Sequence, residues 1–179
     1  MVLGYVLSPK DNKKIMLSNI ELSPCDKFSN IYSINKIDPN FRMRSKSDIS
    51  YTYDGFVIVS YRFKIFCEEH CYIGVEFIPL PNAVNFFWFK VNNIIEYDSE
   101  RRDTQFINYN KDCDGYEEII GATPAFIKSN QPLTDNFFRT DICFGSFSGK
   151  SALYIVGEIT KNKLLSAGFK ELFFEKVHK

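Results

Sequence analysis

The segment Ile58–Leu80 reads IVSYRFKIFCEEHCYIGVEFIPL. It opens on apolar residues typical of a buried strand. Ser60 is placed to cap a helix, because its hydroxyl can accept a hydrogen bond from a backbone N–H of the first turn. We expect the helix to end near Cys71 and a second strand to begin after Gly74. Pro79 ends that strand, since proline cannot donate a hydrogen bond to a sheet. The segment therefore predicts a strand, a short helix and a strand.

A second segment of the same length, Ile155–Val177, repeats this order of elements and reads IVGEITKNKLLSAGFKELFFEKV. Thr160 stands where the helix cap is expected, and Gly168 is placed to end the helix in the left-handed conformation. The two segments together indicate a repeated unit. The buried stripe of the second helix is expected to comprise Leu164, Leu165 and Ala167.

Composition favours strands around these two units. The chain of 179 residues contains eighteen Phe and ten Tyr, and aromatic residues are enriched in strands. Its length suits one domain, with an N-terminal strand-and-loop part over residues 1–55 and a core part over residues 56–179. A first strand is expected to end at Ser8-Pro9. We predict an α+β fold: a mixed, largely antiparallel sheet with a few short helices and a candidate internal duplication, 58–80 and 155–177.

The five cysteines are odd in number and scattered, and the N-terminus lacks the pattern of a secretory signal. We therefore expect a cytoplasmic protein whose thiols are reduced and mostly buried. Cys67, His70 and Cys71 are metal-ligand types close together, but a zinc site normally takes four ligands and the only other histidine is His178. On the predicted helix Cys67 and Cys71 share a face with Phe63. We expect both to point into the core and no metal or cofactor to bind.

Charge is unevenly distributed although the net charge is zero. Residues 65–122 carry eleven acidic against four basic side chains, whereas the segments on either side are basic. An acidic surface repels nucleic acid but can speed the encounter with a basic protein. We expect an irregular acidic segment with a hairpin turn at Cys113-Asp114-Gly115, and treat it as the candidate surface for a protein partner; a solvated loop is the alternative for any single residue. Its acidic residues are Glu96, Asp98, Glu100, Asp103, Asp112, Asp114, Glu117 and Glu118.

Other function classes find weaker support. The segment Gly145–Ser151, GSFSGKS, is one residue short of the phosphate-binding loop spacing and precedes a strand pattern, so a hairpin turn explains it better. Histidine-based catalysis would depend on His70. The Asp and Glu residues are numerous enough for a catalytic carboxylate pair, but the sequence alone does not show which of them lie together in space. No catalytic residue is therefore predicted. No apolar run reaches the roughly 20 residues that span a membrane. A nucleic-acid module would depend on a short basic patch of Arg42, Arg44 and Lys46.

Several stretches resemble a known family. They are YVLSP near the N-terminus, the aromatic run that ends in VNNIIEYDSE, and the closing segment IVGEITKNKLLSAGFKELFFEKV. Together they are similar to bacterial immunity proteins encoded beside polymorphic toxins, the large secreted proteins used in competition between bacteria. The resemblance covers the first strand and most of the chain from Phe56 onward, with little over residues 8–50. The first unit matches the family pattern at Ser60, Gly74, Val75, Phe77 and Pro79; the second has Gly157 in place of serine and matches at Gly168, Leu172 and Phe174.

The resemblance implies a cytoplasmic antitoxin that binds a cognate toxin domain and neutralises it by stoichiometric occlusion, without turnover. It implies no catalytic residue, cofactor, nucleic acid or membrane, and it leaves the toxin's chemistry and the oligomeric state open. Two alternatives also stay open: an enzyme that reverses a toxin's covalent modification, and a small nucleic-acid-binding module. Protection at concentrations far below the toxin's would reveal the enzyme, and steeply salt-dependent binding the nucleic-acid module.

Overall fold

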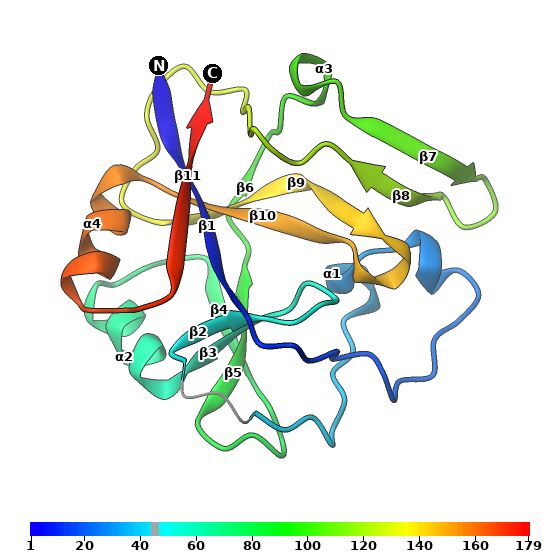
Figure 1. Ribbon diagram of the computed structural model, residues 1–179, viewed down its shortest axis with the longest axis horizontal. Coiled ribbons are helices and arrows are strands. Elements are labelled where there is room, and N and C mark those ends of the chain that lie inside the picture. Colours follow the sequence, from blue (N-terminus) through cyan, green and yellow to red (C-terminus); the bar gives the residue numbers. More distant parts are fainter. Residues whose placement is uncertain (44–46) are drawn as a thin grey trace.

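The computed structural model describes residues 1–43 and 47–179 and confirms the α+β class, with a mixed, mostly antiparallel sheet and short helices (Figure 1). The helices are α1 (Ile31–Ile34), α2 (Tyr61–Glu69), α3 (Ser99–Arg102) and α4 (Glu158–Ser166), with 3-10 turns η1 (Asp26–Phe28) and η2 (Phe147–Gly149). The strands are β1 (Val2–Asp11), β2 (Ile49–Tyr51), β3 (Val57–Ser60), β4 (Val75–Pro79), β5 (Phe86–Val91), β6 (Ile94–Ile95), β7 (Gln105–Asn110), β8 (Gly115–Ile120), β9 (Phe137–Ser146), β10 (Ser151–Val156) and β11 (Leu172–His178).

Both predicted strand-helix-strand units are present, and they are built alike. In the first unit, β5 lies between β3 and β4 and pairs antiparallel with each. In the second unit, β1 lies between β10 and β11 and again pairs antiparallel with each. The two strands of a unit therefore run parallel to one another with a strand from outside the unit between them. Figure 1 shows α2 and α4 together along one side of the sheet, and the two chain ends beside each other where β1 meets β11.

The two helices begin differently. In α2, the Ser60 hydroxyl accepts a hydrogen bond from the Phe63 N–H at 3.3 Å, as predicted. In α4 the predicted cap is wrong: Gly157 is the N-cap, and Thr160 lies buried within the first turn. A Cβ atom at Gly157 would lie 2.4 Å from the Thr134 carbonyl oxygen, so only glycine fits there. The left-handed conformation predicted for Gly168 is confirmed by its φ of +73°.

The core joins the two units through aromatic side chains. Phe63 of α2 is fully buried, and its ring centroid lies 5.2 Å from that of Phe89, 5.9 Å from Phe137 and 5.3 Å from Phe169. These partners come from β5, from β9 and from the segment before β11. Such edge-to-face pairs add stability beyond the area they bury. Leu165 is 52% exposed, so its assignment to the buried stripe of α4 is wrong.

Three other expectations are corrected or fall outside the described residues. The first strand does not stop at Ser8-Pro9, because β1 continues to Asp11, where it pairs in parallel with β2. The acidic segment is regular: it forms α3 and a β7–β8 hairpin. The hairpin turn spans residues 111–114, so the predicted turn Cys113-Asp114-Gly115 is displaced, and Gly115 already belongs to β8. Of the basic patch, Arg42 is exposed, while Arg44 and Lys46 lie outside the described residues.

The cysteines differ from expectation in two ways. Cys25 and Cys113 form a disulfide, so the prediction of reduced thiols throughout is wrong. Cys67 and Cys143 are buried, but Cys71 is exposed because the chain turns to a φ of +53° there, just past the end of α2. The inward orientation predicted for both helix cysteines therefore holds only for Cys67. Among the described residues, no helix is long and apolar enough to cross a membrane.

Candidate functional site

The β7–β8 hairpin extends from the body of the protein at one end of the sheet (Figure 1). Its outer strand carries Phe106, 41% exposed, and Tyr109, 54% exposed. Both rings contact Tyr116 of β8, with centroids 5.1 and 5.0 Å apart. Ile120 adds a further exposed side chain, at 40%. Phe106, Tyr116 and Tyr109 therefore form a continuous aromatic row on the hairpin, and Ile120, whose partner in the register is Gln105, lies outside this row.

The eight predicted acidic residues fall into two groups, one near α3 at the base of this hairpin and one spread from its turn to the middle of β8. The group near α3 consists of Glu96, Asp98, Glu100 and Asp103. Glu96 pairs with Lys128 at 2.7 Å, and Asp98 caps α3 by accepting from the Arg101 N–H at 3.1 Å. Glu100 and Asp103 are exposed.

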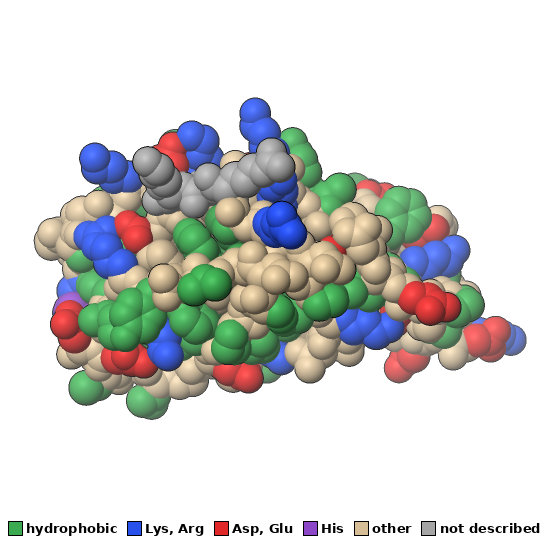
Figure 2. Space-filling model, turned by 90° about the horizontal axis from the view of Figure 1, so that it is seen from below, with side chains coloured by type: hydrophobic (Ala, Val, Ile, Leu, Met, Phe, Trp, Pro, Cys, Tyr) green, Lys and Arg blue, Asp and Glu red, His purple; other side chains and the backbone are tan. Residues whose placement is uncertain are grey.

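The second group consists of Asp112, Asp114, Glu117 and Glu118, at the turn and along β8. Asp112 is exposed, and Asp114 accepts a hydrogen bond from the Tyr109 hydroxyl at 2.8 Å, which raises the pKa of that tyrosine. Glu118 is turned toward the body and accepts from the Ser146 hydroxyl at 2.7 Å. The structure thus brings exposed carboxylates to both ends of the aromatic row without joining them into one cluster. Figure 2 shows Asp and Glu side chains at the narrow end of the molecule to which the hairpin extends.

The turn end of the hairpin is attached to the N-terminal segment. The Cys25–Cys113 disulfide links the turn to η1. Beside it, Lys150 is only 2% exposed, and its Nζ donates to the carbonyl oxygens of Lys27, Glu117 and Phe147 at 2.9, 3.3 and 2.5 Å. Burial lowers the pKa of Lys150 to about 8. A buried ammonium group enclosed by carbonyl oxygens holds three separate segments in contact.

The opposite end of the hairpin is attached to the body by other contacts. The hydroxyl of the buried Tyr97 lies 3.0 Å from the carbonyl oxygens of Gly121 and Ala122. Arg102 donates from Nε to the Thr123 carbonyl at 2.8 Å, and β8 pairs with β9 at Glu118 and Ile119. Both ends of the aromatic row are therefore fixed.

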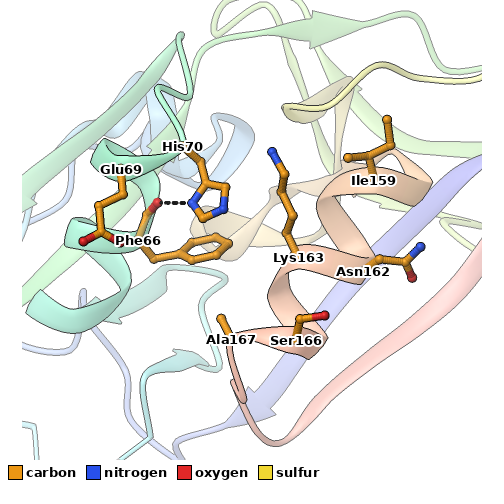
Figure 3. A pocket seen from close by; sticks show the side chains of 8 residues that line it. All are labelled: Phe66, Glu69, His70, Ile159, Asn162, Lys163, Ser166 and Ala167. Atoms are coloured by element: carbon orange, nitrogen blue, oxygen red, sulfur yellow. Dashed lines mark hydrogen bonds between the residues drawn. The ribbon is translucent and has the colours of Figure 1, made fainter.

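A groove, separate from the hairpin, lies between α2 and α4 and encloses a volume of about 540 Å³ (Figure 3). The His70 Nδ1 lies 2.9 Å from the Phe66 carbonyl oxygen, so Nδ1 is the donor and a neutral ring keeps its lone pair on Nε2. Figure 3 shows His70 and Lys163 on facing sides of the groove with the Glu69 carboxylate turned away. The remaining lining residues are Ile159, Asn162, Ser166 and Ala167.

A hydrogen-bond network around Asp135 meets this groove at Lys163, which lines it. Asp135 accepts from the Tyr72 hydroxyl at 3.1 Å, from the Thr160 hydroxyl at 2.9 Å and from Lys163 at 2.5 Å. Burial of Asp135 opposes its ionisation, but these hydrogen bonds outweigh it and lower its pKa. Desolvation and the bond to Asp135 raise the pKa of Tyr72. The network joins the two units and explains why Thr160 is buried.

Sequence patterns indicated the acidic residues but missed the aromatic row and its attachments. The sequence does not distinguish the Phe and Tyr of β7 from the many other aromatic residues of the chain. The prediction of a contact surface therefore depends on acidic charge alone. Within residues 1–43 and 47–179, no three His, Cys, Asp or Glu side chains lie close enough to hold a metal ion. No protein-family model matches the sequence, and a comparison with curated proteins finds no significant match.

Proposed function

We propose that this chain is an immunity protein that binds a cognate toxin domain and neutralises it by stoichiometric occlusion, with the β7–β8 hairpin as its contact surface. The observation that carries the proposal is the aromatic row formed by the exposed Phe106 and Tyr109 on either side of the partly buried Tyr116, with exposed carboxylates at both ends. The resemblance to immunity proteins supports the biological role, and the row supports a protein partner.

The chemistry of the hairpin suits a protein contact. Aromatic residues are enriched at the centres of interfaces, where they often contribute most of the binding free energy. Carboxylates at the rim speed association with a basic partner. Because both ends of the hairpin are attached to the body, little conformational entropy remains to be lost on binding. A rigid, aromatic and acidic hairpin is therefore expected to bind a basic surface of the toxin.

Co-expression tests this proposal. The probe is the C-terminal domain of the large secreted protein encoded next to this chain, produced in a bacterial host with and without it. We expect growth to be rescued and a one-to-one complex to be isolated. Failure to neutralise that domain, or any toxin domain of the producing strain, would overturn the immunity role.

A matched pair of variants tests the contact surface. Phe106→Ser combined with Tyr109→Ser should weaken the complex by roughly a hundredfold or more, as loss of two central aromatic residues does. The control is Phe173→Ser, which removes an aromatic residue that is 66% exposed on β11, and it should leave binding unchanged. If both variants bind as the wild type does, the hairpin is not the contact surface.

Enzymatic protection is the second candidate function, and the groove between α2 and α4 favours it. There a neutral His70 would keep the Nε2 lone pair available as a general base, with Lys163 facing it. Rescue at chain concentrations far below those of the toxin, lost in His70→Gln but kept in His178→Gln, would favour this candidate over occlusion.

A further inference from the structure

We propose that the Cys25–Cys113 disulfide is a redox-controlled attachment of the hairpin tip, by which we mean residues 109–116. In the oxidised protein the tip is held against the segment around η1. Reduction releases the tip while the rest of the fold persists. For its effect on partner binding, this inference rests on the proposed function; for the release itself it does not.

The other contacts of the tip are weak. Gly115 approaches the N-terminal segment so closely that a Cβ atom would lie 2.4 Å from the Phe28 carbonyl oxygen, and the glycine makes this contact without a side chain. Just beyond the tip, the Lys27–Glu117 ion pair spans 3.8 Å, and the lysine side chain is 52% exposed. Exposed pairs of this kind contribute little. The covalent bond is therefore the main attachment of the tip.

The contacts of the opposite end do not depend on the disulfide. Tyr97 holds the chain after β8, Arg102 holds Thr123, and β8 pairs with β9 at Glu118 and Ile119. Lys150 lies between the two ends and holds the Glu117 carbonyl. The hairpin is thus hinged at its base, so reduction frees one end only.

The disulfide is accessible from solvent, as is the free thiol of Cys71. Cys25 and Cys113 are both partly exposed. In contrast, burial raises the pKa of the Cys67 thiol well above its usual value and that of Cys143 to about 12, so neither supplies a thiolate at neutral pH. In a cytoplasm kept reducing by low-molecular-weight and protein thiols, a disulfide is usually transient or redox-sensing.

The reaction is thiol–disulfide exchange with a dithiol reductant. Its thiolate attacks one sulfur of the pair, and a mixed disulfide forms as the second cysteine leaves as a thiolate and takes up a proton. The second thiol of the reductant then displaces the first cysteine. The protein gains two thiols and the dithiol becomes a disulfide. A disulfide oxidant reverses both steps.

Hydrogen exchange on the free protein tests the release. The oxidised protein is compared with the protein reduced by dithiothreitol and with the Cys25→Ser/Cys113→Ser variant. Amides of residues 109–116 should exchange roughly tenfold faster or more after reduction and in the double variant. Amides of β1 and β11 should keep their protection. Cys71→Ser, which removes an exposed free thiol, is the control and should leave the redox response intact.

Three results would overturn the inference. One is equal exchange at the tip in oxidised and reduced protein. Another is loss of protection in β1 and β11 as well, because it would show unfolding instead of local release. A third is alkylation of all five cysteines in protein treated with a disulfide oxidant, because the pair would then not form. If the tip is released as expected but no toxin binds either form, the proposed function fails and the redox attachment stands.

Discussion

The ammonium group of Lys150 donates a hydrogen bond to the carbonyl oxygen of Lys27, 2.9 Å away and 123 residues earlier in the chain. Carbonyl oxygens of Phe147 and Glu117 accept from the same group. Peptide carbonyl dipoles therefore solvate the buried charge in place of water. Lys150 and its three carbonyl partners form one polar junction between η1, η2 and β8. The junction holds β8 at Glu117, beside the tip that the Cys25–Cys113 disulfide attaches.

The Lys150 junction predicts a dependence of stability on pH. Burial lowers the pKa of Lys150 from 10.5 to about 8, so between these values the unfolded chain holds a proton that the folded protein has lost. The free energy of unfolding contributed by this group therefore rises with pH in that window. We expect the stability difference between wild type and Lys150→Met to shift by about 2 kcal/mol in favour of wild type from pH 7.5 to 9.5.

Denaturant unfolding of both proteins measures this shift. The comparison is needed because the buried thiols of Cys67 and Cys143 have raised pKa values. In both proteins these thiols make the free energy of unfolding fall as the pH rises, which is opposite to the effect of Lys150. Taking the difference cancels them. A difference that stays constant over the pH range would contradict the low pKa.

Phe63 is predicted to be the most sensitive aromatic position of the core. It contacts Phe89, Phe137 and Phe169 and so joins elements of both units. Phe63→Ala should lower the free energy of unfolding by about 3–5 kcal/mol, because the transfer free energy is lost and a cavity remains. Phe173→Ala, at an exposed site, should change it by less than about 0.5 kcal/mol. If the two variants lose comparable amounts of the free energy of unfolding, Phe63 is not the most sensitive aromatic position of the core.

Asp135 is predicted to support the fold only while it is ionised. Its lowered pKa means that its contribution is present at neutral pH and is lost as the pH falls through the folded-state value. Asp135→Asn should destabilise the protein by about 1–3 kcal/mol at pH 7, and less below about pH 4. Asp112→Asn, at an exposed site in the turn, is the matched control. Thermal unfolding over pH 3–7 measures the stability difference between wild type and Asp135→Asn. If this difference does not become smaller at acid pH, an ionised Asp135 does not stabilise the network.

Charge reversal should show whether the carboxylates at the two ends of the aromatic row, and not other acidic residues, speed association with the toxin domain. Asp112→Lys and Glu100→Lys change exposed residues at the two ends of the aromatic row. Each should slow association with the toxin domain roughly twofold to tenfold and reduce its salt dependence. Glu175→Lys, an exposed change on β11, should not. Stopped-flow or surface-based kinetics at two ionic strengths measure this, and equal slowing by all three would point to net charge alone.

Local signals predicted the elements well where the forces are local. The Ser60 cap, the Gly168 helix end and the turn before Gly115 all depend on hydrogen bonds or backbone angles within a few residues. The same logic failed at Thr160, where close contact with the Thr134 carbonyl selects Gly157 as the cap and Asp135 accepts the threonine hydroxyl. A residue distant in sequence overrode the local preference.

The candidate site was predictable only in part. Charge density indicates Asp112 and Glu100 as exposed carboxylates, but it does not distinguish them from Glu118, which bonds to Ser146. Nor does periodicity separate the exposed Tyr109 from the buried aromatic residues. Exposure depends on which side of the hairpin faces the body, and the sequence carries no local signal for that.

The sequence by itself therefore determined the two strand-helix-strand units, the aromatic core and the hairpin turn, because capping, glycine angles and apolar runs act over short distances. Only the tertiary structure decided that β5 and β1 lie within those units, that Cys25 meets Cys113 across 88 residues, and that Lys150 is buried against Lys27. These pairings follow from the joint burial of distant segments, and that free energy belongs to the assembled core and to no single stretch of the chain.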